Sequence, residues 1–185
     1  MSLKVEDLAI PDVKLVLPAR FRDDRGFFSE TYQRERFLEY GLDAQFVQDN
    51  HSHSLKAFTI RGLHFQAPPF AQAKLVRVIR GSIVDVAVDI RKASPTYGQW
   101  VKAVLSAENG LQLFVPRGFL HGFATLAPDT EVVYKVDAPY SKACDGAVLW
   151  NDPTLRIDWG IYNSQVSLSE KDAAAPAFRD FISPF

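Results

Sequence analysis

Residues 83–90 alternate between two faces of an extended chain, and this alternation constrains the fold more than any other feature of the sequence. The even positions are Val84, Val86, Val88 and Ile90, whereas the odd positions read Ile, Asp, Ala and Asp. A period of two is that of a β-strand with one wholly apolar face and one mixed face. Similar patterns bounded by turn residues predict further strands at 74–79, 99–105, 111–115, 121–126 and 131–136. Many short strands at this spacing indicate a sandwich or a barrel.

The length and charge of the chain narrow its class. A chain of 185 residues predicts one domain, residues 1–185, that buries about 70% of its unfolded surface. A formal net charge of −1 favours neither a nucleic-acid footprint nor a polybasic membrane patch. The single cysteine, Cys144, cannot form an internal disulfide, which fits a reducing compartment. With no signal-peptide pattern at the N-terminus and no long apolar run, we expect a cytoplasmic protein without nucleic-acid or membrane partners.

Helices are expected only at the periphery of this β structure. Residues 31–40 read as a short helix, rich in Glu and Arg, that is stopped by Gly41. The tail from Ser167 also reads as helical, with Ser169 three residues before Asp172 and an alanine run after it. The predicted fold class is therefore all-β with short peripheral helices.

A base, a second imidazole and a cation in one β-patterned block indicate a site that moves protons. His64 is either a hydrogen-bonded core histidine or a general base, since imidazole exchanges protons near neutral pH. His121, behind a turn, either packs there or polarises a carbonyl group. Lys74 either extends to water from a strand end or stabilises an enolate oxygen inside a barrel. Asp172 fits a capping box, and Tyr134, between two valines, reads by itself as a core tyrosine.

Short motifs follow one another in a recognisable order along the chain. They are DRGFFSE at 24–30, QDN at 48–50, RGLHFQ at 61–66, KLVRV at 74–78, DVAVDIR at 85–91, SPTYG at 94–98, GFLHGF at 118–123, YK at 134–135, WNDP at 150–153 and LSEKD at 168–172. From Phe21 to about Pro176 the chain closely resembles the dTDP-4-dehydrorhamnose 3,5-epimerase family. The resemblance implies a jelly-roll β-barrel of the cupin type.

The resemblance also implies a reaction without a metal or other cofactor. The substrate would be dTDP-4-dehydro-6-deoxy-D-glucose, epimerised at C3 and C5 to dTDP-4-dehydro-L-rhamnose for dTDP-L-rhamnose or related deoxysugar synthesis. His64, oriented by Asp172, would be the base, and Tyr134 would return a proton to the opposite face of the sugar. Lys74 and His121 would stabilise the enolate oxygen between these steps.

The same resemblance implies a set of substrate contacts and a shared active site. The contacts would be Arg25, Phe27, Glu30, Gln48, Asn50, Arg61, His121, Tyr140, Asp145 and Lys171. The segment with Arg25 and Glu30 would reach into the site of a partner subunit, so the protein would be a homodimer. Tyr140 is the alternative to Tyr134 as the acid. Two departures from the family lie nearby, because Ala138-Pro139 replaces a usual aromatic residue and Asp145 stands where glutamate is more common.

Three other classes of protein share part of this pattern. A one-carbon epimerase, or one for another sugar nucleotide, would have nearly all these motifs. A binding protein without activity would need the arginines but not a base, an acid and a cation together. A metal-dependent cupin fits Pro116-x-Gly118-x-x-His121, but it needs His-x-His where this chain has His64-Phe65-Gln66. His51-Ser52-His53 has ligand spacing, yet we expect it in a polar loop outside the barrel, so the sequence favours no metal site.

Overall fold

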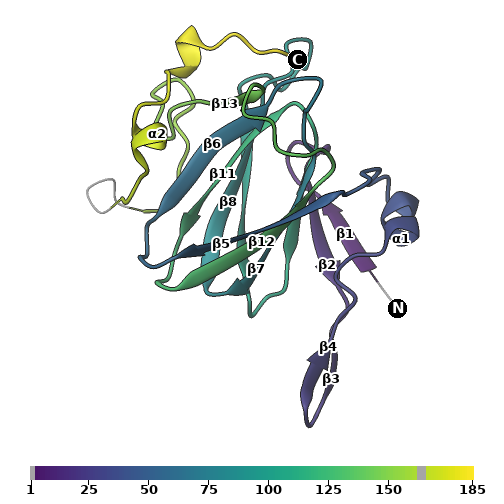
Figure 1. Cartoon of the computed structure of the whole chain (residues 1–185). Helices are drawn as coiled ribbons and strands as arrows, with labels where there is room; N and C mark the ends of the chain where they lie inside the picture. Colours follow the sequence, from purple (N-terminus) through teal and green to yellow (C-terminus); the bar gives the residue numbers. More distant parts are fainter. Residues whose placement is uncertain (1–2, 162–165) are drawn as a thin grey trace.

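Two β-sheets face each other in the structure, a computed structural model that describes residues 3–161 and 166–185 (Figure 1). Within these ranges one sheet has six strands, in the order β1 (Leu3–Asp7), β2 (Lys14–Pro18), β10 (Gln112–Val115), β7 (Lys74–Arg80), β12 (Thr130–Val136) and β5 (Gln48–Ser54). The other sheet, in the same ranges, has five, in the order β13 (Asp145–Ala147), β6 (Ile60–Gln66), β11 (Phe119–Thr125), β8 (Ser82–Asp89) and β9 (Trp100–Ser106). A hairpin of β3 (Phe21–Asp23) and β4 (Gly26–Phe28) projects away from both sheets (Figure 1). The predicted all-β jelly-roll barrel is confirmed.

The six segments expected from their alternation are all strands, β7 to β12, and their ends agree with the prediction to within two residues. The prediction missed β1 to β5 and the short strand β13. Most of these strands are short, or lie at the edge of a sheet, and several are largely exposed. Alternation of apolar and polar residues is weak in such strands, because little of either face is buried and few apolar side chains mark one face.

The expectation of a polar loop at His51-Ser52-His53 is wrong, since these residues form part of strand β5. Among the strands that the structure describes, this one is at the edge of the six-stranded sheet and pairs with β12 alone. It contains no apolar residue, so hydrophobic periodicity could not reveal it. Its imidazoles contact acidic groups on and just before the neighbouring strand β12, with His51 Nε2 2.9 Å from Glu131 and His53 Nε2 3.3 Å from Asp129.

The first helix, α1 (Arg34–Glu39), is shorter than the predicted 31–40. It begins after Gln33, whose side chain accepts a hydrogen bond from the backbone N–H of Arg36. It ends as predicted before Gly41, which has the left-handed φ of 73° that suits glycine at this position.

The prediction of a helical tail is largely wrong. Ser167 pairs with Thr59 in an isolated β-bridge, and only α2 (Glu170–Ala173) and a short 3₁₀ helix (Phe178–Asp180) follow. Pro176 prevents α2 from continuing, since it lacks a backbone donor and clashes with the preceding turn. No helix of the described residues is long and apolar enough to cross a membrane.

Both faces of β8 are buried, and this arrangement decides which side chains can line a site. Ile83 and Ala87 pack between the two sheets with Val76 and Leu113. The wholly apolar face of β8 packs instead against tryptophans and the C-terminal segment, which covers the outside of its sheet (Figure 1). The mixed face therefore points into the barrel and carries Asp85, one of its two acidic residues, into the interior. Each fully buried valine or isoleucine stabilises this arrangement by roughly 1.5–3 kcal/mol.

Candidate active site

A cavity of about 420 Å³ opens between the two sheets and joins the residues predicted to move protons. Its lining includes His64 on β6, His121 on β11, Lys74 on β7 and Tyr134 on β12. His64 and His121 are register partners in the antiparallel pair of β6 and β11, so the two imidazoles start from adjacent backbone positions. Asp172 enters the same cavity from α2.

His64 and Asp172 form a tight pair. The Nε2–H of His64 donates to Asp172 Oδ1 at 2.5 Å, and the carboxylate is almost fully buried while the imidazole is partly open. Burial raises the pKa of Asp172, but hydrogen bonds from His64, Ser169 and the Gly62 backbone lower it further than burial raises it. Because a carboxylate holds Nε2–H, the lone pair of His64 is on Nδ1, as a general base requires.

The capping role considered for Asp172 is also present, without conflict. The Ser169 hydroxyl accepts a hydrogen bond from the backbone N–H of Asp172 at 3.1 Å and so caps α2. The backbone of Asp172 uses the cap, whereas its carboxylate meets His64. One turn of helix therefore fixes the position of the acid group.

Two glycines shape the wall beside His64. Gly62 has φ +136°, and a Cβ added there would lie 2.5 Å from the Cα of Gly122 in the neighbouring strand. The close backbone contact accompanies an irregular register in this pair of strands. As a result Arg61 and His64, which regular alternation would put on opposite faces, both line the cavity. The Arg61 guanidinium donates hydrogen bonds to Ser54 Oγ at 3.2 Å and to the carbonyl oxygen of His53 at 3.0 Å.

Lys74 and Tyr134 are partly buried titratable groups on neighbouring strands. Burial lowers the pKa of Lys74 to about 8, although the charges of Asp85 and Asp145 raise it. Burial raises the pKa of the Tyr134 hydroxyl, and the charge of Arg61 opposes this. Tyr134 therefore keeps its proton at neutral pH, and Lys74 is close to its own titration.

A second cavity of about 230 Å³ adjoins the first and shares His64, Lys74, Tyr134 and Lys171 with it. Its other lining residues include four of the predicted substrate contacts, namely Gln48, Asn50, Tyr140 and Asp145. The two adjoining cavities together offer space for a ligand that is larger than the reacting sugar alone.

Hydrogen bonds organise this second cavity. The Gln48 amide donates to Asn50 Oδ1 at 2.8 Å and accepts from the backbone N–H of Tyr140 at 3.2 Å. Asp145 accepts from the Tyr140 hydroxyl at 3.3 Å and from the Lys171 ammonium, and the latter bond raises the pKa of Lys171. The shorter acid at position 145 thus reaches the neighbouring lysine. Tyr140 itself is 59% exposed and lies at the rim, whereas Tyr134 is partly buried and lines both cavities.

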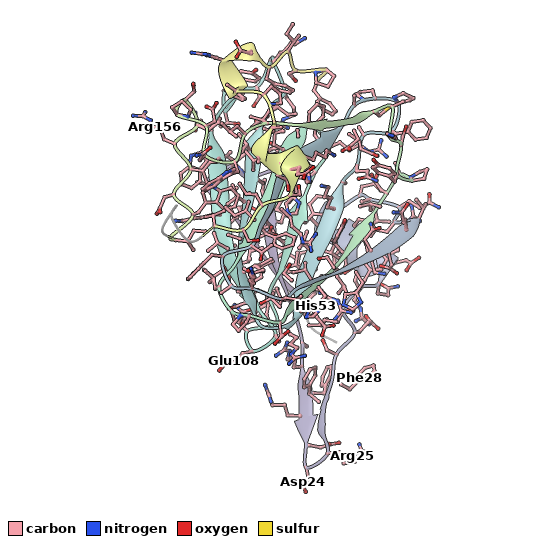
Figure 2. All side chains as sticks on the ribbon, turned by 60° about the vertical axis from the view of Figure 1, so that its left-hand side comes forward. Asp24, Arg25, Phe28, His53, Glu108 and Arg156 are labelled. Atoms are coloured by element: carbon pink, nitrogen blue, oxygen red, sulfur yellow. The ribbon has the colours of Figure 1, made fainter. Side chains whose placement is uncertain are left out.

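Three predicted substrate contacts lie elsewhere. Arg25 is in the turn between β3 and β4, with its side chain 89% exposed and bonded to Asp23 (Figure 2). Phe27 follows on β4 and is 54% exposed. Glu30 accepts from Arg36 at 2.5 Å. None of the three lines either cavity of its own chain.

Asp85 is a buried carboxylate in the barrel that the sequence analysis did not single out. Its Oδ1 accepts a hydrogen bond from His121 Nε2 at 2.7 Å, and its side chain is fully buried. The available signal was an acidic residue on the mixed face of an otherwise apolar strand, which identifies a buried acid but not its partner.

A metal site would need several His, Cys, Asp or Glu side chains close together. Within residues 3–161 and 166–185, no group of three or more His, Cys, Asp or Glu side chains is arranged to hold a metal ion. His64 and His121 each use one ring nitrogen on a carboxylate, which leaves one nitrogen each. His51 and His53 lie on β5 with acidic partners of their own.

Known proteins resemble the chain over nearly its whole length. The family model described as dTDP-4-dehydrorhamnose 3,5-epimerase matches residues 7–180. A Sinorhizobium fredii protein with that name is 52% identical over 172 residues, which are 93% of this chain and 88% of that protein. A Bacillus anthracis dTDP-4-dehydrorhamnose 3,5-epimerase structure with TDP and PPi bound is 51% identical, with a TM-score of 0.91, and the match covers 95% of this chain and 99% of that one.

Two further similar structures contain different sugar nucleotides and belong to enzymes with different epimerase reactions. A Legionella pneumophila 3,5-epimerase in complex with dTDP-4-keto-L-rhamnose has a TM-score of 0.93 and 41% identity, covering 98% of this chain and 95% of that one. A 3′-monoepimerase from Streptomyces bikiniensis in complex with dTDP-quinovose has a TM-score of 0.84 and 31% identity, covering 92% of this chain and 86% of that one. The match to the family model and the high identity to its members lead to one conclusion: the chain belongs to the dTDP-4-dehydrorhamnose 3,5-epimerase family, a family of isomerases.

Proposed function

We propose that this chain converts dTDP-4-dehydro-6-deoxy-D-glucose into dTDP-4-dehydro-L-rhamnose by epimerisation at C3 and C5, without a metal or other cofactor. The observation that carries the proposal is the His64–Asp172 pair, which shares one cavity with Lys74 and Tyr134. The C4 ketone of such a substrate acidifies the C–H bonds on both neighbouring carbons. A base, a cation and an acid are then sufficient for each inversion.

Each inversion takes two proton transfers. Nδ1 of His64 removes the proton from the carbon beside the ketone, and Asp172 stabilises the imidazolium that forms. The electron pair moves onto the ketone oxygen to give an enolate, beside the ammonium of Lys74. The Tyr134 hydroxyl gives its proton to the opposite face of the carbon. The remaining cavity residues bind the sugar and the nucleotide, with Arg61 and Lys171 suited to the diphosphate.

The second candidate is an epimerase that inverts one carbon only. The 31% identity to a 3′-monoepimerase supports keeping it, since the same fold serves both reactions. Inversion of both carbons is favoured by the higher identity to proteins named 3,5-epimerase.

The direct test is proton NMR of the purified protein with dTDP-4-dehydro-6-deoxy-D-glucose, before and after dialysis against a strong chelator. We expect inversion at C3 and C5 and an unchanged rate after chelation, because two histidines bonded to carboxylates do not make a usual metal site. A product inverted at one carbon would favour the second candidate. Activity that is lost on chelation and restored by metal would refute the cofactor-free mechanism.

The pKa of Lys74 leads to a prediction about pH. Lys74 acts as a cation and is protonated below its pKa of about 8, so kcat/KM should fall as the pH rises through this value. The fall should approach about tenfold per pH unit. Tyr134 and Lys171, which face the same space, have raised pKa values and titrate at higher pH.

The matched control for this prediction is Lys74→Arg, which keeps the positive charge throughout the range. Its rate can be lower, but its profile should lack the fall near pH 8. A fall at the same pH in Lys74→Arg would assign that titration to another group. A wild-type profile that is level to pH 10 would mean that the charge of Lys74 does not matter.

We further propose that the protein acts as a homodimer whose active sites each combine two chains. Support comes from the hairpin of β3 and β4, which projects from the barrel with exposed Phe21, Phe27 and Phe28 (Figure 1). Exposed aromatic residues on a projecting hairpin are suited to packing against another surface. Arg25, at the tip of this hairpin, lies outside the cavities of its own chain and would complete the cavity of a partner. A stable dimer would bury roughly 1,200–2,000 Å² in all.

Mixed dimers test this arrangement. Arg25→Ala and His64→Ala should each be nearly inactive alone, but a mixture that has exchanged subunits should recover activity. Each mixed dimer has one site with both native residues, and roughly half of the dimers are mixed, so we expect about a quarter of wild-type activity. Kinetic assays and mass photometry before and after subunit exchange measure this. An unchanged low rate after exchange, or a fully active monomer, would refute the shared site.

Residues 1–185 would act as one epimerase domain, a proposal supported by the match of the family model to residues 7–180. The cytoplasmic location inferred from the single cysteine and the N-terminal sequence stays a prediction.

A further inference from the structure

The barrel contains a second histidine–carboxylate pair, formed by His121 and Asp85. The distance from His121 Nε2 to Asp85 Oδ1 is 2.7 Å, and the two residues are 6% and 0% exposed. The reaction proposed above gives no role to Asp85. A fully buried carboxylate is costly unless it is bonded, so its presence beside the site calls for a physical reason.

The hydrogen bond determines which ring nitrogen of His121 carries a proton. An ionised carboxylate only accepts, so the proton of the bond belongs to Nε2. Burial lowers the pKa of His121, and the charge of Lys74 lowers it further, against the raising effect of Asp85. The imidazole is therefore neutral, with its one proton on Nε2 and a lone pair on Nδ1.

The lone pair of His121 faces the cavity. Nδ1 forms no hydrogen bond with any residue that the structure describes. Among those residues, the only side-chain nitrogen or oxygen that is both buried and without a partner is Asp85 Oδ2, so Nδ1 of His121 is not a fully buried atom. Nδ1 is thus accessible, and His121 lines the cavity with His64, Lys74 and Tyr134. A neutral nitrogen with a lone pair repels a ketone or enolate oxygen, but it can accept a hydrogen bond from a hydroxyl group.

We propose that Asp85 is a positioning residue that holds His121 in the Nε2–H form, so that His121 Nδ1 accepts a hydrogen bond from a ring hydroxyl of the sugar. The proposal rests on the sugar substrate proposed above. It gives His121 a different role from the carbonyl contact expected from the sequence, and it leaves the negative oxygen to the cation of Lys74. It also separates the two histidines, because His64 is more exposed than His121 and remains the base.

Nitrogen-15 NMR of the substrate-free protein tests the protonation state directly. The chain has four histidines, so the His121 signals can be assigned by their absence from His121→Gln. We expect a protonated Nε2 and an unprotonated Nδ1 in the wild type throughout neutral pH. In Asp85→Asn the side-chain amide can donate to Nε2, which should move the proton to Nδ1. A wild-type His121 that is protonated on Nδ1, or on both nitrogens, would overturn the proposal whether or not any variant folds.

Asp89→Asn is the matched control. Asp89 is also fully buried on β8, but it bonds Arg91, Ser94 and Thr96, and it does not line the cavity. Its substitution should cost stability without moving the His121 proton. A shift of the proton in both variants would show a general effect of disturbing β8 and would contradict the role of Asp85.

The hydroxyl contact is tested with two substrate analogues that each lack one of the two ring hydroxyls. Deuterium uptake at C5 serves as the readout for both. Loss of one of the two substrate hydroxyls should lower kcat/KM of the wild type about tenfold. Loss of the same hydroxyl should lower kcat/KM of Asp85→Asn much less. Equal losses in the wild type and in Asp85→Asn would refute the contact. If no substrate exchanges at all, the proposed function fails, while the NMR result still decides the form of His121.

Discussion

His64→Ala should abolish uptake of solvent deuterium at both C3 and C5 when the protein is incubated with substrate in deuterium oxide. The wild type should take up deuterium at both carbons during turnover, since each inversion passes through an enolate. One base serves both carbons, because His64 is held by Asp172 in the cavity that Lys74 and Tyr134 also line. Loss of a general base typically lowers a rate by about 10²–10⁴, and proton NMR of the sugar signals measures the loss.

Two variants make this result specific. Asp172→Asn keeps the imidazole but removes the carboxylate that fixes Nε2–H, so exchange should fall at both carbons together. His51→Ala removes another imidazole bonded to a carboxylate, on strand β5 and outside both cavities, and should leave exchange unchanged. An active His64→Ala, or a loss confined to one carbon, would contradict a single shared base.

The strands of the barrel were predictable because most of them have apolar or alternating runs of residues bounded by turn residues. In β8 the sequence separated an apolar face from a mixed face, and the structure has the mixed face toward the interior. Alternation alone does not reveal this choice, since the C-terminal segment that covers the apolar face is distant in sequence. For the same reason Asp85 could be seen as unusual but not as a partner of His121.

The site residues were found by motif, and their grouping depends on local backbone features that no motif states. Gly62 and Gly122 approach closely, which brings Arg61 into the same cavity as His64. The polar edge strand β5 carries Gln48 and Asn50 to the second cavity, although its sequence has no apolar pattern. The hairpin with Arg25 projects from its own barrel (Figure 1), and the function proposed for it depends on a second copy of the chain.

In the proposed site one group removes a proton and a different group returns it. His64, Lys74, Tyr134 and Lys171 line both cavities, so the base, the cation and the acid border one shared space. The base and the acid come from different sheets, β6 and β12. Substitution of the acid should therefore stop delivery of a proton to the opposite face and leave removal of the proton by the base.

Tyr134→Phe should continue to exchange protons while epimerisation fails at one carbon at least. The change removes only a hydroxyl group, so His64 and Lys74 can still form the enolate, and His64 can return a deuteron to the face from which it took a proton. Epimerisation should fall about 10²–10⁴-fold, the range for loss of a general acid, so that exchange with retained configuration outpaces inversion. Tyr140→Phe is the matched control, because its hydroxyl bonds Asp145 at the rim and should affect KM rather than the ratio of exchange to inversion. If Tyr140→Phe alters that ratio and Tyr134→Phe does not, Tyr140 is the acid. Equal losses of exchange and inversion in Tyr134→Phe would mean that the Tyr134 hydroxyl acts before the enolate forms.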